Sequence, residues 1–261
     1  MLKVENLSGG YTRKKNVLRD ISFSLERGEL VCVVGKNASG KSTLLRMMLG
    51  LTERSCGEVT VDDVSINDMS RRDIARKLAY LTQGTDVPDM TVGELVLHGR
   101  FAHTAAMSPY SERDRAIADE CIERMGLSEL TDTHLAELSG GTRQKAYLAM
   151  VLCQQTEYIL LDEPTTYLDI SHQIDLMRQL RALADEGRGV LCVMHDIPLA
   201  LEYSDKVAVI EDGTLVAFDT PRQICDSGIL HSALGVVVKY DGERYVYQFN
   251  RNDIPKVKCS R

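Results

Sequence analysis

The sequence predicts an α/β fold: a mostly parallel central sheet with an N-terminal antiparallel β subdomain and an inserted α-helical subdomain. Short continuous apolar runs are typical of strands that are buried on both faces of a parallel sheet. Helical periodicity separates several of these runs along the chain. The runs lie at 30–34, 158–162, 190–194 and 207–211 of the 261 residues.

The first strand signal of the antiparallel part is an alternation over residues 20–26. Ile21, Phe23 and Leu25 are apolar and alternate with polar residues, which indicates a half-buried strand. Between two of the central strands, residues 171–186 carry apolar residues at helical spacing. The inner face of this helix is expected to present Ile174, Met177, Leu180 and Ala184.

Strand signals are missing between residues 86 and 154. Ser111 and Asp114 form a capping-box-like helix start, and apolar residues then recur at helical spacing. We therefore expect residues 86–154 to be a helical subdomain inserted between core segments 1–85 and 155–235.

The C-terminal segment has a pattern of its own. Alternating apolar residues flank Asp241 and Gly242 on both sides, which indicates a β-hairpin. We expect residues 236–261 to form this hairpin and a tail, in which 251–261 are polar and frayed.

Residues 35–43 match the phosphate-loop pattern G-x-x-x-x-G-K-[ST], with an apolar strand before it and a helix after it. Such a loop turns backbone N–H groups toward one anion, and the helix start adds its positive dipole end. Lys41 is expected to reach the β- and γ-phosphates, and Ser42 to offer a hydroxyl to Mg²⁺. The alternative interpretation is a glycine-rich turn without a ligand. We expect ATP or GTP to be bound by Gly35, Lys36, Asn37, Ala38, Ser39, Gly40, Lys41, Ser42 and Thr43.

An acidic pair, Asp162 and Glu163, follows the apolar run at 158–161. A parallel sheet presents ligand-binding groups at the carboxyl ends of its strands. Asp162 is therefore expected to hold Mg²⁺, and Glu163 to lie where a water could be activated for hydrolysis of a phosphoanhydride. The alternative is a simple helix N-terminus.

The tetrapeptide Leu-Ser-Gly-Gly occurs at 7–10 and again at 138–141. The second copy opens a helical run, so its free N–H groups could bind an anion. The first copy is expected in a turn after a short strand.

Together these motifs resemble the ATP-binding subunits of ABC transporters over about residues 1–235. The matching positions, in family order, are Tyr11, the phosphate loop, Gln83, the 138–141 segment, Asp162 with Glu163, Asp169 and His195. The resemblance implies a RecA-like P-loop NTPase fold, with ATP and Mg²⁺ as ligands. One departure is Thr142, which stands where the family usually has glutamine and puts that glutamine's phosphate contact in doubt.

The resemblance also implies roles for single residues. Tyr11 would stack on adenine, although an aromatic packed on the core is the alternative. Gln83 would reach Mg²⁺ or water. His195 would contact the γ-phosphate rather than remain a buried, hydrogen-bonded histidine. Asp169 would line a dimer face, and it could also cap the helix at 171–186.

In the resembling family two copies sandwich two ATP molecules head to tail. Ser139, Gly140 and Gly141 of one copy would then close over the nucleotide of the other copy. Further stretches, including Gly99, Arg100 and His103, resemble the importers of iron–siderophore, haem and cobalamin type. In that subgroup residues 86–110 would contact polytopic membrane subunits, and a substrate-binding protein would be only an indirect partner.

Bulk properties restrict the function classes. The formal net charge of −7 and the lack of a long basic run argue against nucleic acid as a partner. No apolar stretch reaches the length of a membrane span, and residues 1–5 lack a signal-peptide profile. We expect a peripheral protein on the cytoplasmic face of the membrane. The rival interpretations are a soluble ABC ATPase of DNA repair or translation and an unrelated P-loop kinase or GTPase.

Overall fold

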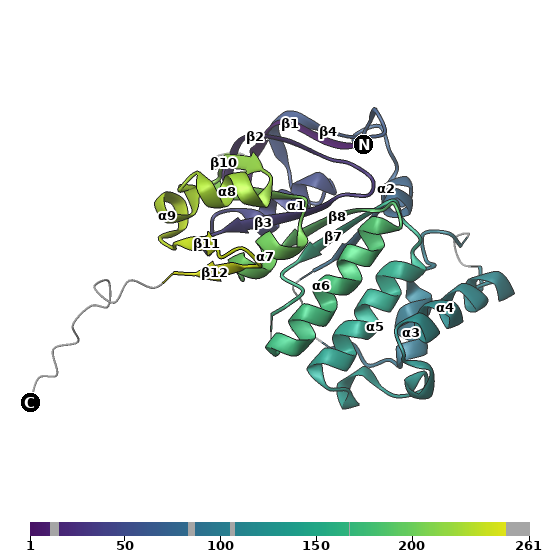
Figure 1. Ribbon diagram of the computed structural model, residues 1–261. Helices are drawn as coiled ribbons and strands as arrows, with labels where there is room; N and C mark the ends of the chain where they lie inside the picture. The colour runs from purple at the N-terminus through teal and green to yellow at the C-terminus, as the bar shows by residue number, and fades with distance from the viewer. Residues whose placement is uncertain (11–15, 83–86, 105–107, 167, 249–261) are drawn as a thin grey trace, which may run out of the picture.

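The computed structural model describes residues 1–10, 16–82, 87–104, 108–166 and 168–248 (Figure 1). Within these residues a central sheet has the strand order β10-β9-β3-β8-β7-β6. Its strands pair in parallel except at β10, which runs antiparallel to β9. The strands are β3 (Leu30–Gly35), β6 (Leu78–Leu81), β7 (Tyr158–Asp162), β8 (Gly189–Val193), β9 (Lys206–Glu211) and β10 (Thr214–Asp219). The predicted α/β fold with a mostly parallel core is confirmed.

Both faces of the central sheet are covered, which explains the continuous apolar runs. Val31 and Val33 of β3 belong to one buried cluster, and Leu30 and Cys32 belong to the other. Successive side chains of a strand point to opposite faces, so a strand buried on both sides needs an apolar residue at every position. The first cluster includes α1 (Lys41–Met48), and the second includes α5 (Gly140–Cys153), α6 (Ile170–Asp185) and α7 (Ile197–Tyr203).

The N-terminal part forms a second, antiparallel sheet with the order β2-β1-β4-β5. Its strands are β1 (Leu2–Gly9), β2 (Leu18–Leu25), β4 (Arg54–Val61) and β5 (Val64–Ser65). The predicted alternating strand at 20–26 is β2. The expectation of a turn for the first Leu-Ser-Gly-Gly copy was wrong, because Leu7–Gly9 pair with β2 and β4 as the end of β1. Leu7 is fully buried there, and this packing keeps the segment extended.

A group of helices extends from one end of the central sheet (Figure 1). It contains α3 (Val92–His98), α4 (Glu112–Arg124) and α5, with short 3₁₀ turns at Ser128–Leu130 and Leu135–Glu137. Helix α2 (Arg71–Lys77) precedes β6 in the core. The predicted capping box is present: Ser111 accepts a hydrogen bond from the Asp114 amide, and Asp114 accepts one from the Ser111 amide.

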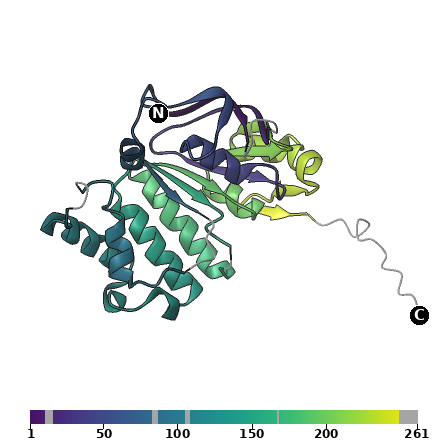
Figure 2. The same ribbon diagram turned by 180° about the vertical axis from the view of Figure 1, so that it is seen from behind.

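The C-terminal elements pack at the other end of the molecule (Figures 1 and 2). They are α8 (Pro221–Asp226), α9 (Ile229–Leu234), β11 (Val238–Tyr240) and β12 (Tyr245–Tyr247). The last two form the predicted hairpin. Residues 249–261, including the expected frayed tail, lie outside the described residues. In the described part of the chain, no helix combines the length and the apolar character that crossing a membrane requires.

Candidate nucleotide site

The loop between β3 and α1 has the conformation of an anion cradle. Gly40 has a φ of 106° and Ala38 a φ of 62°, both in the left-handed region. A Cβ on Gly35 would lie 2.5 Å from the carbonyl oxygen of Ile210, so glycine is required where β3 meets β9. The Oγ of Ser39 is buried without a hydrogen-bond partner among the described residues, as expected for a loop built to hold a ligand.

Lys41 is held inside this loop. Its Nζ donates hydrogen bonds to the carbonyl oxygens of Gly35, at 2.9 Å, and Lys36, at 3.1 Å. Burial lowers the pKa of Lys41, and the nearby carboxylates of Glu163 and Asp162 oppose that effect. The lysine amine is therefore positioned among the backbone groups that would surround a phosphate.

The carboxyl end of β7 brings Asp162 next to the start of α1. The Ser42 hydroxyl donates to Asp162 Oδ1 at 3.0 Å, and the Tyr80 hydroxyl lies 3.4 Å from Asp162 Oδ2. Burial raises the pKa of Asp162, while the hydrogen bond from Ser42 lowers it. A hydroxyl and a carboxylate at this spacing form an oxygen donor set that fits a hard cation such as Mg²⁺.

The next residue, Glu163, has a strained backbone with a φ of 52°. Non-glycine residues uncommonly occupy this region, and for a side chain as long as that of glutamate the conformation costs free energy. Its Oε1 lies 2.6 Å from His195 Nε2, although β7 and the end of β8 are far apart in the sequence. The Glu163 side chain is 11% exposed and that of His195 is 46% exposed, so the pair is open to solvent on the histidine side.

A cavity of about 710 Å³ connects these groups. Residues from the phosphate loop, from the segment that follows β7 and from the segment that follows β8 therefore meet at one place, and their roles in binding and catalysis stay predictions. Its lining is formed by Val17, Asn37, Ala38, Gly40, Lys41, Ser42, Thr43, Glu163, Thr166 and His195.

The second Leu-Ser-Gly-Gly segment lies outside this cavity. Ser139 is the N-cap of α5, and its Oγ accepts a hydrogen bond from the Thr142 amide and lies 2.8 Å from Thr142 Oγ1. Gly140 lines a separate cavity of about 460 Å³, which Asp162 and Glu163 also line. Among the described residues that line the phosphate-loop cavity, none belongs to 139–141.

Asp169 caps α6, as one of the two interpretations predicted. Its Oδ1 accepts hydrogen bonds from the His172 amide, at 2.9 Å, and the Ser171 hydroxyl, at 2.8 Å. These contacts, led by the His172 amide, lower the pKa of Asp169 to about 2. The His172 ring fills the space next to Gly141, where a Cβ would approach it to 2.6 Å. The dimer-face role of Asp169 stays a prediction.

Two predicted site residues, Tyr11 and Gln83, lie outside the described residues. Sequence reasoning overlooked Tyr80, Val17 and Thr166. Tyr80 had a weak signal, a hydroxyl-bearing side chain inside an otherwise aliphatic strand next to the β7 strand that carries Asp162. Val17 and Thr166 carried no signal, because only the tertiary structure brings them to the phosphate loop.

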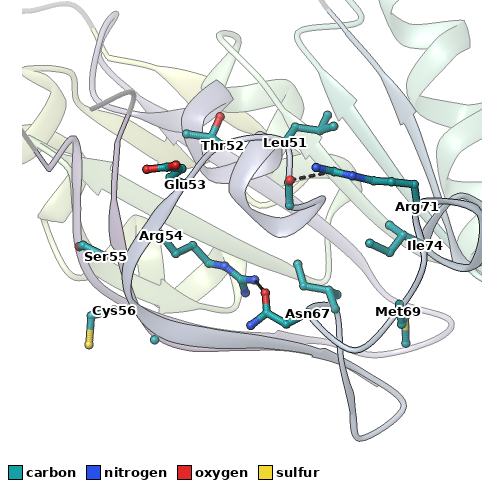
Figure 3. Close-up of a pocket in the computed structure, with 13 residues that line it drawn as sticks. Leu51, Thr52, Glu53, Arg54, Ser55, Cys56, Asn67, Met69, Arg71 and Ile74 are labelled. Atoms are coloured by element: carbon teal, nitrogen blue, oxygen red, sulfur yellow. Dashed lines mark hydrogen bonds between the residues drawn. The ribbon is translucent and has the colours of Figure 1, made fainter. Parts of the chain in front are cut away.

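A larger cavity lies elsewhere, between the end of α1, β4 and α2 (Figure 3). It measures about 920 Å³. Protein atoms already engage its two arginines: Arg54 pairs with Asn67, and Arg71 donates to the carbonyl oxygen of Gly50 at 2.8 Å. None of the described residues lining it belongs to the predicted nucleotide site, so size alone does not identify the site.

Comparison with protein families gives a match to the model described as ABC transporter over residues 18–166. The petrobactin import ATP-binding protein FatE of Bacillus anthracis is 38% identical over 232 residues, which cover 88% of this chain and 92% of that protein. The iron(3+)-hydroxamate import ATP-binding protein FhuC of Bacillus subtilis is 36% identical, with 88% and 86% covered.

The chain is also similar to solved structures of ABC transporters. A metal-chelate type ABC transporter in an inward-facing conformation matches with a TM-score of 0.82 at 25% identity, covering 95% of this chain and 98% of that one. A bacterial ABC transporter cassette solved as a dimer, MJ0796, matches with a TM-score of 0.73 at 27% identity, covering 85% and 99%.

Proposed function

Because the chain belongs to the ABC transporter family, we propose that it is the ATP-hydrolysing subunit of an importer for iron–siderophores or similar metal chelates. The observation that carries the proposal is the Glu163–His195 pair at 2.6 Å beside the phosphate loop. The relatives supply the direction and class of transport, since they are named as import proteins for petrobactin and hydroxamate iron. These names favour an importer subunit over a soluble repair or translation ATPase.

Each group has a role in hydrolysis. The backbone amides of 36–43 and the Lys41 amine bind the phosphates of ATP. Ser42 and Asp162 would hold Mg²⁺, which neutralises the developing phosphate charge when bound. Glu163 accepts the proton of the attacking water, and His195 holds the Glu163 carboxylate and contacts the γ-phosphate. Gln83 would orient the water, and Tyr11 would stack on adenine.

The nucleotide site of one chain is a half-site. Residues 139–141 present a helix N-terminus, the natural partner of an anion, but they do not line the chain's own phosphate-loop cavity. A second copy placed head to tail would supply this helix start, together with Asp169, to each ATP. The dimeric cassette structure supports such a pairing.

The contact with membrane subunits is proposed for residues 86–110. Phe101 is 74% exposed, so its ring would be available to a partner at this surface. The backbone around it is fixed: Arg72 and Arg76 each donate to the carbonyl oxygen of Ala102, at 2.8 and 2.9 Å. Through this contact the protein would be peripheral on the cytoplasmic face, and a substrate-binding protein would reach it only indirectly.

Sedimentation with and without ATP tests the composite site. We expect monomers without nucleotide and dimers with ATP, most clearly in Glu163→Gln, which should bind ATP and hydrolyse it only slowly. Adding Ser139→Arg should prevent the dimer, because the long arginine side chain obstructs the helix start that must approach the phosphates. Ser128→Arg, at the exposed start of a 3₁₀ turn, is the matched control. If the sedimentation mass is the same with and without ATP, and ATPase activity stays full at high dilution, one chain completes the site.

Uptake measurements test the substrate class. Cells that depend on this chain should import ferric hydroxamate or catecholate chelates, and cells with Glu163→Gln should not. Uptake that is unchanged by Glu163→Gln would contradict the importer assignment.

A further inference from the structure

The C-terminal hairpin reaches the helix that follows the proposed catalytic histidine. The amide of Ile197, the first residue of α7, donates a hydrogen bond to the Tyr247 hydroxyl at 3.2 Å. Ile197 is two residues after His195. β12 packs against α7 in the structure, and both views show them side by side (Figures 1 and 2).

This bond completes the start of α7. The first amides of a helix have no partner within the helix. Asp196 accepts from the Leu199 amide at 2.9 Å, and Pro198 has no N–H to satisfy. The Ile197 amide is the remaining first-turn donor, and Tyr247 supplies its acceptor from a segment far along the chain.

The hairpin is anchored firmly enough to act as a support. Val238 is 4% exposed and belongs to the main buried cluster, and Tyr247 packs against the same cluster. The Gln248 amide donates to the carbonyl oxygen of Val237 at 2.8 Å, and the Tyr245 amide lies 3.4 Å from Glu202 of α7. Burial raises the pKa of Tyr247, so its hydroxyl stays neutral.

We propose that Tyr247 is a positioning residue for ATP hydrolysis, which fixes the peptide after His195 and thereby holds His195 against Glu163. The inference rests on the proposed role of His195. The side chain of His195 is 46% exposed, so little packing restrains it. Its placement depends on a backbone that is fixed at both ends, by β8 before it and by the capped start of α7 after it.

Tyr247→Phe in the full chain tests the proposal, because it removes the hydroxyl and keeps the ring. We expect kcat for ATP hydrolysis to fall about two- to tenfold, the worth of one neutral hydrogen bond, with KM for ATP unchanged. Tyr245→Phe is the matched control: it lies on the same hairpin, its ring packs against Tyr240, and kcat should stay at the wild-type value. An unchanged kcat in Tyr247→Phe would overturn the proposal.

A double-mutant cycle separates positioning from general stability. His195→Ala should lower kcat strongly, and adding Tyr247→Phe should lower it no further, because the hydroxyl acts through His195. An additional independent loss would show that Tyr247 acts through stability alone and would overturn the inference. Full activity of His195→Ala would instead overturn the proposed function of His195.

The donor side of the bond gives a second test that leaves the hairpin intact. Ile197→Pro removes the amide hydrogen at a helix position where proline is tolerated. It should lower kcat as Tyr247→Phe does, whereas Ile197→Val, which keeps the donor, should not. If both Ile197 variants behave alike, the hydrogen bond has no part in catalysis.

Discussion

The central sheet and the helical segment from 92 to 153 hold their polar side chains in place by different means. In the sheet, parallel strands buried on both faces bring Asp162, Glu163 and His195 to one edge. In the helical segment a buried ion pair fixes the positions of Arg100 and Asp114. Arg100 donates to Asp114 at 3.0 Å and to the carbonyl oxygen of Cys153 at 2.8 Å. The Arg100 side chain is 7% exposed and the Asp114 side chain is 12% exposed.

This difference indicates how each region responds to change. The sheet edge depends on apolar burial, which many residues share, so removing one polar group there alters chemistry more than stability. The helical segment also has an apolar core, but among its described residues a charged network joins α4 to the end of α5, and a buried charge without its partner is costly. The following predictions test this contrast, from the largest expected effect to the smallest.

Glu163→Gln should lower ATP hydrolysis about 10²–10⁴-fold, because the amide cannot accept the proton of the attacking water. ATP binding and the thermal midpoint of unfolding should stay near wild type. Steady-state ATPase and nucleotide-binding assays measure the two effects, with the exposed Glu129→Gln as the control. Normal hydrolysis in Glu163→Gln would place the base elsewhere, with His195 as the next candidate.

Arg100→Met should lower the free energy of unfolding by about 3–5 kcal/mol, since Asp114 is left buried without its ion-pair partner. Urea unfolding measures this loss. Arg124→Met is the control, because Arg124 pairs with Glu186 at the surface and should cost at most about 1 kcal/mol. Equal losses in the two variants would show that the buried network has no special part in this region.

Lys41→Ala should weaken ATP binding about ten- to a hundredfold, the worth of the lost charge-assisted phosphate contact. The free energy of unfolding should change little without nucleotide. Equilibrium binding measures the affinity, and Lys3→Ala, at a half-exposed lysine on β1, is the control. Wild-type affinity in Lys41→Ala would refute the phosphate-loop assignment.

Acid should weaken the helical segment by about 2 kcal/mol through Asp114. Two hydrogen bonds lower the pKa of Asp114 from 3.8 to about 2: the larger effect comes from the Ser111 hydroxyl and the next from the Arg100 guanidinium. The stabilisation is therefore present above pH 3.8 and is lost as the pH falls toward 2. Urea unfolding at pH 5 and pH 3 should show a smaller difference for Asp114→Asn than for wild type, and an equal difference would contradict this origin.

The sequence alone predicted the parallel core, the phosphate loop, the acidic pair and the C-terminal hairpin. These features are local: a run of apolar residues, a spacing of glycines or a turn dipeptide restricts the backbone wherever it occurs. Local patterns do not report pairing with distant strands, which explains the error at Leu7–Gly9. There the local pattern indicated a turn, but pairing with β2 and β4 keeps the chain extended.

Contacts between distant segments were decided by the tertiary structure alone. The 2.6 Å approach of His195 to Glu163, the Arg100–Asp114 pair and the hydrogen bond from Ile197 to Tyr247 each join residues that no periodicity links. Such contacts depend on strand order and on which helix ends meet. Those are fixed only when the apolar faces pack together, because the free energy of burial depends on area and not on the identity of the polar groups it brings together.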